Sequence, residues 1–406
     1  MAILPNPWKG LAGLPRQAWV LFASTLVNRC GTMALPFLVL YLARDLGFPA
    51  GRAGLVMTVY GTFALVAAPL SGRLCDRLGH LRVMKMSLFS SGAVMLAFPL
   101  ARSWPAVLAA TAVFSLTTES FRPANLAVLA ELAPPDRRKS IFALNRLAIN
   151  LGMSVGPAVG GFLATHSFAA LFAVDGTTTV LAGAVLALFG SAAPRHAHVE
   201  PTRPAFSAPR AAASRPAHRD ARFLLFLATV IPVTMVFFQH VSSMPLYLVR
   251  DLSRPASFYG LLFTVNTLLI VFLEVQINTS TAHWHPGRTL ALGALLVGTG
   301  FGALALARGS GSVMATVVVW TFGEMVLLPG MSSYAADLAP ADRRGEYMGF
   351  YAMAFGVAFA IGPWLGTEVL ARFGGHVLWP STFALGLVSA LAMWRLPALR
   401  PEAPDR

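Results

Sequence analysis

The chain has 406 residues, of which 56% are hydrophobic and 12% charged, and its mean hydropathy is +0.65. About a quarter of the residues of a soluble globular protein are charged, so this composition excludes an ordinary soluble domain. The net charge of +14 would suit nucleic acid, but the basic residues lie in short loops between long apolar segments. We therefore expect a protein of the lipid bilayer that binds no nucleic acid.

The two cysteines, Cys30 and Cys75, lie within or at the end of apolar segments. Two such residues provide no disulfide framework, and no metal-ligand spacing accompanies them, so we expect neither a metal site nor a cofactor. The pair His283 and His285 at a loop is more typical of incidental histidines than of a metal site. The first apolar run is too long for a signal peptide and has no small-residue cleavage site, so we interpret it as a retained helix.

Twelve apolar segments have about twenty residues or more, the length that crosses a bilayer core of about 30 Å. They are predicted at 17–43, 52–71, 83–101, 104–131, 140–164, 167–190, 222–249, 257–279, 287–307, 312–337, 344–371 and 376–395. Residues 191–221 are rich in Pro, Ala, Arg and His without apolar periodicity, which indicates a cytoplasmic linker. The predicted domains are therefore an N-terminal bundle at 1–190 and a C-terminal bundle at 222–406.

The two halves repeat one pattern. Glu131 opens the run Glu-Leu-Ala-Pro-Pro-Asp-Arg-Arg, and 206 residues later Asp337 opens Asp-Leu-Ala-Pro-Ala-Asp-Arg-Arg. The pairs Gly156-Pro157 and Gly362-Pro363 keep the same offset. A repeat without insertions predicts a duplicated unit. The expected fold class is an all-α membrane protein with twelve transmembrane helices in two pseudo-symmetric six-helix halves.

The distribution of Lys and Arg predicts the orientation. With both termini inside the cell, the inner segments hold about three times as many basic residues as the outer loops. The expected location is therefore a bacterial inner (plasma) membrane, crossed many times, with both termini cytoplasmic.

The loop after the second span carries the most specific motif. It reads Gly72-Arg-Leu-Cys-Asp76-Arg77-Leu-Gly79-His-Leu-Arg82. This resembles the signature loop of the major facilitator superfamily, Gly-x-x-x-Asp-Arg-x-Gly-x-x-Arg, in its usual place. The resemblance extends over nearly the whole chain and implies a transporter whose loop braces the two halves, with Glu131 as the partner of the loop. The matching segment of the second half has lost the pattern.

The fifth span carries a second motif, Gly152-x-x-x-Gly156-Pro157-x-x-Gly160-Gly161. Small residues four apart make a smooth face for close helix packing, and the proline bends the helix. The run resembles the motif of drug:proton antiporters within the superfamily, in which it is thought to keep the cavity from leaking. A generic packing face is the alternative interpretation.

Charged residues inside predicted spans are costly unless they face a cavity or a partner. In the superfamily the first, fourth, seventh and tenth helices line the central cavity. That resemblance implies a substrate and proton cavity containing Arg29, Glu119, Arg122 and Glu324. Secondary charged candidates are Arg146, Asp175 and Glu274.

Structural roles compete with these assignments. Glu119 and Arg122 are three residues apart, so a buried ion pair is as good an interpretation as a substrate or proton role. Arg146 and Asp175 suit structural roles better. A structural role is harder to assign to Glu324 and Glu274, because their half has no embedded Lys or Arg, and a carboxyl group without a counter-charge in a low dielectric tends to take up a proton.

These patterns predict a secondary transporter, not an enzyme, since no intramembrane nucleophile or metal-ligand set is present. The expected activity is proton-coupled efflux of small amphipathic molecules, such as drugs or secondary metabolites, by alternating access. A proton-coupled symporter that imports a nutrient or peptide is the first alternative, and a non-transporting receptor or intramembrane enzyme is a remote one. The expected partners are a small-molecule substrate, protons and the lipid bilayer, and we expect a monomer.

Overall fold

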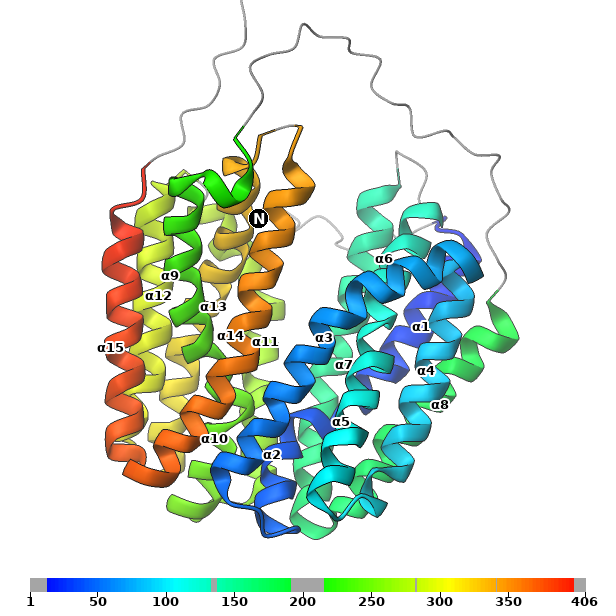
Figure 1. Cartoon of the computed structure of the whole chain (residues 1–406), viewed down its shortest axis with the longest axis horizontal. Coiled ribbons are helices and arrows are strands. Elements are labelled where there is room, and N and C mark those ends of the chain that lie inside the picture. The colour runs from blue at the N-terminus through cyan, green and yellow to red at the C-terminus, as the bar shows by residue number, and fades with distance from the viewer. Residues whose placement is uncertain (1–12, 133–136, 191–214, 282, 341, 398–406) are drawn as a thin grey trace, which may run out of the picture. The chain divides into compact units, whose positions relative to one another are not determined.

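The computed structural model describes residues 13–132, 137–190, 215–281, 283–340 and 342–397. These residues form helices joined by short turns, with no strand among them (Figure 1). Eleven helical segments of this part of the chain are long and apolar enough to cross a membrane. The remaining predicted span, 104–131, is present as two shorter helices. The prediction of an all-α membrane protein with twelve spans is therefore confirmed.

The elements of the N-terminal part are α1 (Arg16–Gly31), α2 (Ala34–Arg44), α3 (Ala50–Leu78), α4 (His80–Ala97), η2 (Phe98–Leu100), α5 (Trp104–Glu119), α6 (Phe121–Leu132), α7 (Arg138–His166) and α8 (Phe168–Phe189). Those of the C-terminal part are η3 (Ala217–Arg219), α9 (Ala221–Phe237), η4 (Phe238–Val241), α10 (Ser243–Leu246), η5 (Tyr247–Asp251), α11 (Ala256–Thr281), α12 (Pro286–Gly302), η6 (Ala303–Ala305), α13 (Ser310–Leu338), α14 (Arg344–Phe373) and α15 (Gly375–Trp394).

Packing divides the chain into two units. The first comprises Met1–Phe37 and Phe63–Ala205, and the second comprises Leu38–Thr62 and Phe206–Arg406. Unlike the predicted halves, this grouping adds Leu38–Thr62 to the second unit, where the hydroxyl of Thr58 donates to the carbonyl of Ala360. The domain boundaries at 190 and 222 stay a prediction.

The first span is interrupted between α1 and α2. The backbone N–H groups that begin α2 have no acceptor within their own helix, and a bilayer offers them none. Asp175 of α8 fills this role, since its Oδ2 accepts from the N–H of Met33 at 3.0 Å and of Ala34 at 2.7 Å. Asp175 is 5% exposed. Its observed contacts are those of a cap at a broken membrane helix.

The fourth span is interrupted at Ser120, between α5 and α6. Pro123 has no N–H to donate to the carbonyl four residues earlier, so the helix loses a bond at this point. Serine hydroxyls of neighbouring helices supply other donors. Ser71 donates to the carbonyl of Ser120 at 2.9 Å, and Ser87 donates to the carbonyl of Thr117 at 2.6 Å. Hydrogen bonds from neighbouring helices therefore stabilise the interruption of the fourth span.

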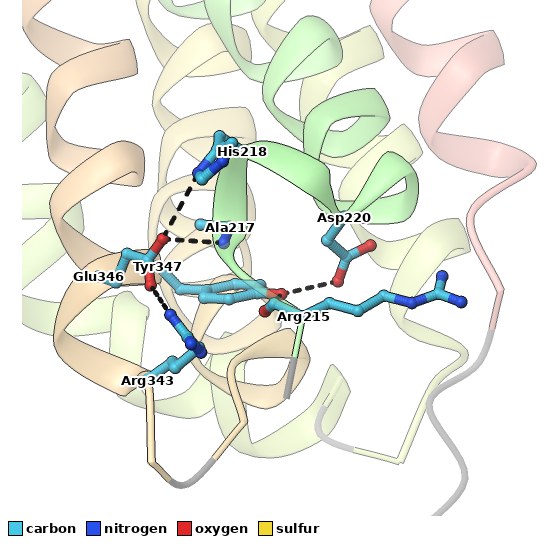
Figure 2. A network of polar contacts seen from close by, with 7 residues as sticks. All are labelled: Arg215, Ala217, His218, Asp220, Arg343, Glu346 and Tyr347. Atoms are coloured by element: carbon cyan, nitrogen blue, oxygen red, sulfur yellow. Dashed lines mark hydrogen bonds and ion pairs between the residues drawn. The ribbon is translucent and has the colours of Figure 1, made fainter. Parts of the chain in front are cut away.

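The end of the predicted linker packs against the first turn of α14, as Figure 2 shows. Residues 191–214 of that linker lie outside the described residues. Oε1 of Glu346 accepts from the N–H of Ala217 at 3.0 Å, and His218 Nδ1 lies 3.9 Å from the same oxygen. Oε2 of Glu346 accepts from Arg343 at 2.9 Å. One carboxylate thus ties the chain before α9 to the start of α14.

The adjacent tyrosine fixes the start of α9 (Figure 2). The hydroxyl of Tyr347 donates to Oδ2 of Asp220 at 2.9 Å, and it lies 3.2 Å from the carbonyl oxygen of Arg215. The other carboxylate oxygen of Asp220 caps α9 by accepting from the N–H groups of Arg222 and Phe223. The ring of Phe223 packs on Tyr347 with centroids 4.5 Å apart, and both side chains are fully buried.

Candidate functional site

The signature loop is a one-residue turn between α3 and α4. Gly79 has φ +86° and ψ 146°, a conformation that only glycine adopts readily. The other motif residues, Gly72, Asp76, Arg77 and Arg82, are exposed. Among the described residues the carboxylate of Asp76 has no hydrogen-bond or ion-pair partner. Its predicted bracing role stays a prediction.

Glu131, at the end of α6, lies beside the signature loop. Its Oε1 is 2.7 Å from Nδ1 of His80, the first residue of α4. Cys75 is 5% exposed in the same region. Burial raises the pKa of the Cys75 thiol, and the charges of Asp76 and Glu131 act in the same direction, against a lowering contribution from the Ser71 hydrogen bond. The loop therefore carries a shielded, weakly reactive thiol.

The glycine motif of α7 forms a buried stripe. Gly152, Gly156, Pro157, Gly160 and Gly161 are buried, whereas the intervening Leu151, Val155 and Val159 are exposed. The buried stripe faces α1 and the break that follows α1. A methyl group added at Gly156 would lie 2.8 Å from the carbonyl oxygen of Arg29, and one at Gly160 would lie 2.6 Å from Cβ of Met33. Only glycine permits this approach of the two helices.

The second half makes the same contact with α14 and α9. A methyl group added at Gly362 would lie 3.0 Å from Cα of Met235, and one at Gly366 would collide with the amide of Gln239. The buried Gln239 side chain donates to the carbonyl of Gly362 at 2.8 Å and accepts from Ser243 at 2.7 Å. Gln239 thus supports the broken end of α9.

The predicted cavity charges of the first half lie on three helices, α1, α5 and α6. Arg29 lies on α1 against the glycine stripe, and Glu119 ends α5 at the helix break. Arg122 is exposed and makes no ion pair with Glu119, or with any other residue that the structure describes. Arg146 is exposed on α7. The described contacts therefore include no buried ion pair between Glu119 and Arg122, and the roles of both residues stay predictions.

Glu324 lies midway along α13, where it is partly buried. Its Oε2 accepts from Nδ2 of Asn266, on α11, at 2.8 Å. The same amide nitrogen lies 3.0 Å from the hydroxyl of Thr321, which itself donates to the carbonyl of Val317. No Lys, Arg or His of the described chain forms an ion pair with Glu324. Its one charged neighbour there is Glu274, which acts on it electrostatically.

Aromatic side chains surround Trp320, one turn before Glu324 on α13. The rings of Phe237, His240 and Phe301 have centroids 6.1, 6.0 and 5.4 Å from the Trp320 ring. Phe263 of α11 packs on His240 at 5.6 Å. Phe237, His240 and Phe263 are only partly buried. We call Phe237, His240, Phe263, Phe301 and Trp320 the aromatic wall; Trp320 and Phe301 are its buried part, and Trp320 lies one helical turn from Glu324.

Neutral amides are the polar residues that the sequence interpretation missed. Asn125 of α6 donates to Asn145 of α7 at 3.1 Å, and both are buried. Asn278 of α11 donates to the carbonyl of Met325 at 3.2 Å, next to Glu324. The sequence alone could have indicated these residues, because an Asn inside a predicted span needs a hydrogen-bond partner, as a charged residue does. No group of three or more metal-ligand side chains lies together within the described ranges.

The four predicted cavity residues lie in different units, with Arg29, Glu119 and Arg122 in the first and Glu324 in the second. Their convergence stays a prediction. Glu324, Asn266 and Thr321, with the aromatic wall, form a polar and aromatic site within one unit.

Comparison with known proteins gives a consistent family. A family model described as Major Facilitator Superfamily matches residues 21–323 and 241–406. The "Uncharacterized MFS-type transporter YqjV" of Bacillus subtilis (strain 168) is 26% identical over 401 residues, 97% of this chain and 94% of that protein. A "Na(+), Li(+), K(+)/H(+) antiporter" of Planococcus maritimus is 24% identical over 375 residues, 86% of this chain and 88% of its own length.

Solved structures share the fold. A POT family transporter in complex with 5-aminolevulinic acid superimposes with a TM-score of 0.79 at 15% identity, over 95% of this chain and 96% of that one. At this identity the likeness shows the fold alone.

Proposed function

Because the chain belongs to the major facilitator superfamily, we propose that it exports small amphipathic molecules in exchange for protons by alternating access. The family makes it a multi-pass membrane transporter and not an enzyme. The bias of Lys and Arg toward the inner segments supports cytoplasmic termini, and the bacterial relatives support a bacterial inner membrane. The proposal treats the protein as a monomer.

The observation that carries the proposal is the environment of Glu324. A carboxylate at mid-span is costly when charged, and Asn266 offers it one neutral hydrogen bond in place of a counter-charge. Glu274 adds a like charge nearby, and two like charges in a low dielectric are unfavourable. A carboxyl group that is stable with a proton and still hydrogen-bonded after losing it is suited to carry protons.

The aromatic wall supports the substrate class. Aromatic rings bind flat apolar groups by stacking and attract organic cations through their faces. The indole nitrogen of Trp320 is buried and has no hydrogen-bond partner among the described residues. An amphipathic molecule could stack on Phe237 and Phe263 while its basic group approaches Glu324. Such a molecule would use both the aromatic wall and the carboxylate. Binding such a molecule would also displace the proton from Glu324, which couples the two movements.

The test uses ethidium, a flat aromatic cation, in inverted membrane vesicles that contain the wild-type protein. An imposed pH gradient, acid inside, should drive ethidium into the vesicles, and an ionophore that collapses the gradient should abolish uptake. Uptake that needs no gradient would contradict proton coupling. Movement of ethidium only out of the vesicles would support the alternative of import.

Alkali cation exchange is a second candidate. The antiporter from Planococcus maritimus supports it, as do the two carboxylates and the amide and hydroxyl oxygens near Glu324, since hard cations prefer oxygen ligands. Adding NaCl or KCl to energised vesicles and following the pH gradient separates the two. Collapse of the gradient by salt but not by ethidium would favour cation exchange over the proposed efflux.

A further inference from the structure

A cavity lies at the turn between α11 and α12. Its volume is about 560 Å³. It is lined by His283, Trp284, His285, Arg288, Leu292 and Trp394. This segment takes the position of the signature loop in the second half but has lost the Gly-x-x-x-Asp-Arg pattern. The proposed transport mechanism gives this cavity no role.

The lining of the cavity suits an anion. It contains one arginine and two histidines, and none of its six residues is acidic. The guanidinium carbon of Arg288 lies 5.5 Å from the centroid of the Trp394 ring, so the ring holds the charge at the cavity wall. A guanidinium group presents donors in the geometry that a phosphate accepts.

Two further features favour an anion here. Nδ1 of His285 is buried and has no hydrogen-bond partner within the described ranges. His285 is also the residue that precedes α12, a helix of 17 residues, so the first turn of that helix adds the partial positive charge of its N–H groups. An arginine and a helix N-terminus therefore meet around one cavity, and the histidine with the orphaned ring nitrogen is among its lining residues.

The cavity lies at the depth of lipid headgroups. Three membrane-crossing segments have an end at it, since one ends at Thr281, one begins at Pro286 and one ends at Trp394. Trp284 and Trp394 are 45% and 58% exposed, and tryptophan is enriched where a span meets the headgroup layer. The distribution of Lys and Arg predicts that this side is cytoplasmic. Basic pockets between helices on that side are suited to anionic headgroups.

We propose that this cavity binds the phosphate group of an anionic phospholipid of the inner leaflet, with Arg288 as the principal contact and Trp284 and Trp394 against the glycerol and upper acyl region. The site is separate from the proposed transport site. It gives the protein a lipid requirement that is independent of the identity of the exported molecule.

Native mass spectrometry of the full chain tests the proposal. The protein is first placed in an equal mixture of phosphatidylglycerol and phosphatidylcholine and then purified with the lipid that it retains. The wild type should retain phosphatidylglycerol in preference. Arg288→Gln should lower that preference about fivefold, the worth of one basic residue near an anionic surface. Arg308→Gln is the matched control and should leave the preference unchanged. Arg308 lies in the turn before α13, beyond the opposite end of α12 from Arg288.

Trp394→Ala provides a second variant, which keeps the charge but removes the ring beside Arg288, and it should lower the preference in the same direction. Equal preference in the wild type and in both cavity variants would overturn the proposal, as would no preference in the wild type. An excess of inorganic phosphate should not displace the lipid, because phosphate lacks acyl chains. Full displacement of the lipid by inorganic phosphate would assign the site to free phosphate and overturn the lipid assignment.

Discussion

Gly156 packs against the carbonyl of Arg29, and 206 residues later Gly362 packs against Met235, the residue 206 after Arg29. The duplication has thus preserved one helix contact in both halves. In each half this contact lies just before the point at which the first helix is interrupted, after Gly31 and after Phe237. The glycine motif therefore describes how each half packs, and the proposal of proton antiport depends on Glu324 instead.

Gly156→Ala should destabilise the protein. The added methyl would come within 2.8 Å of the Arg29 carbonyl oxygen, a backbone atom that cannot rotate away. Overpacking of this kind costs about 1–3 kcal/mol. Thermal unfolding in detergent should show a lower midpoint for this variant. Gly349→Ala on α14 is the control, since a methyl there meets nothing within 4 Å, and an equal loss in both variants would contradict the packing role.

Asp76→Asn should lower ethidium transport while leaving membrane insertion intact. The change keeps the size of the side chain and removes its charge. Asp76 is exposed, so its loss should not disturb the first unit, and any effect must come from another conformation of the transport cycle. Transport in vesicles, normalised to the amount of inserted protein, is the measurement. A variant that transports at the wild-type rate would leave the loop with only a topological role.

Cys75 should react slowly with a maleimide, measured in a Cys30→Ser background. Burial raises the pKa of its thiol, so the reactive thiolate is scarce near neutral pH. The rate should rise about tenfold per pH unit and continue to rise beyond a pH of about 8.5, the ordinary pKa of cysteine. A plateau below that pH would contradict the raised pKa.

The double variant Glu119→Gln with Arg122→Met should transport no better than the worse of the two single variants. The two residues form no ion pair among the described contacts. Removing one of them therefore leaves no unpaired charge that removal of the other would eliminate. Rates in vesicles, corrected for expression, decide the matter. Rescue in the double variant would show that the two charges pair in another conformation.

The sequence predicted the spans and the duplication, because hydropathy and a fixed offset are properties of the chain alone. It did not predict the break at Ser120, which needs hydroxyl donors from Ser71 and Ser87 on other helices. It identified Glu324 by charge but missed Asn266, a neutral residue whose importance depends on what it faces. Tyr347 was missed for the same reason, since its partner Asp220 comes from the predicted linker.

The central claim is that Glu324 carries the proton, and Glu324→Gln tests it most directly in proteoliposomes. The variant mimics the protonated carboxyl, so ethidium exchange between equal compartments should continue while uptake driven by a pH gradient is lost. Glu368→Gln is the control, because Glu368 pairs with Arg372 near the end of α14 and should keep both activities. Undiminished gradient-driven uptake by the Glu324 variant would contradict the account.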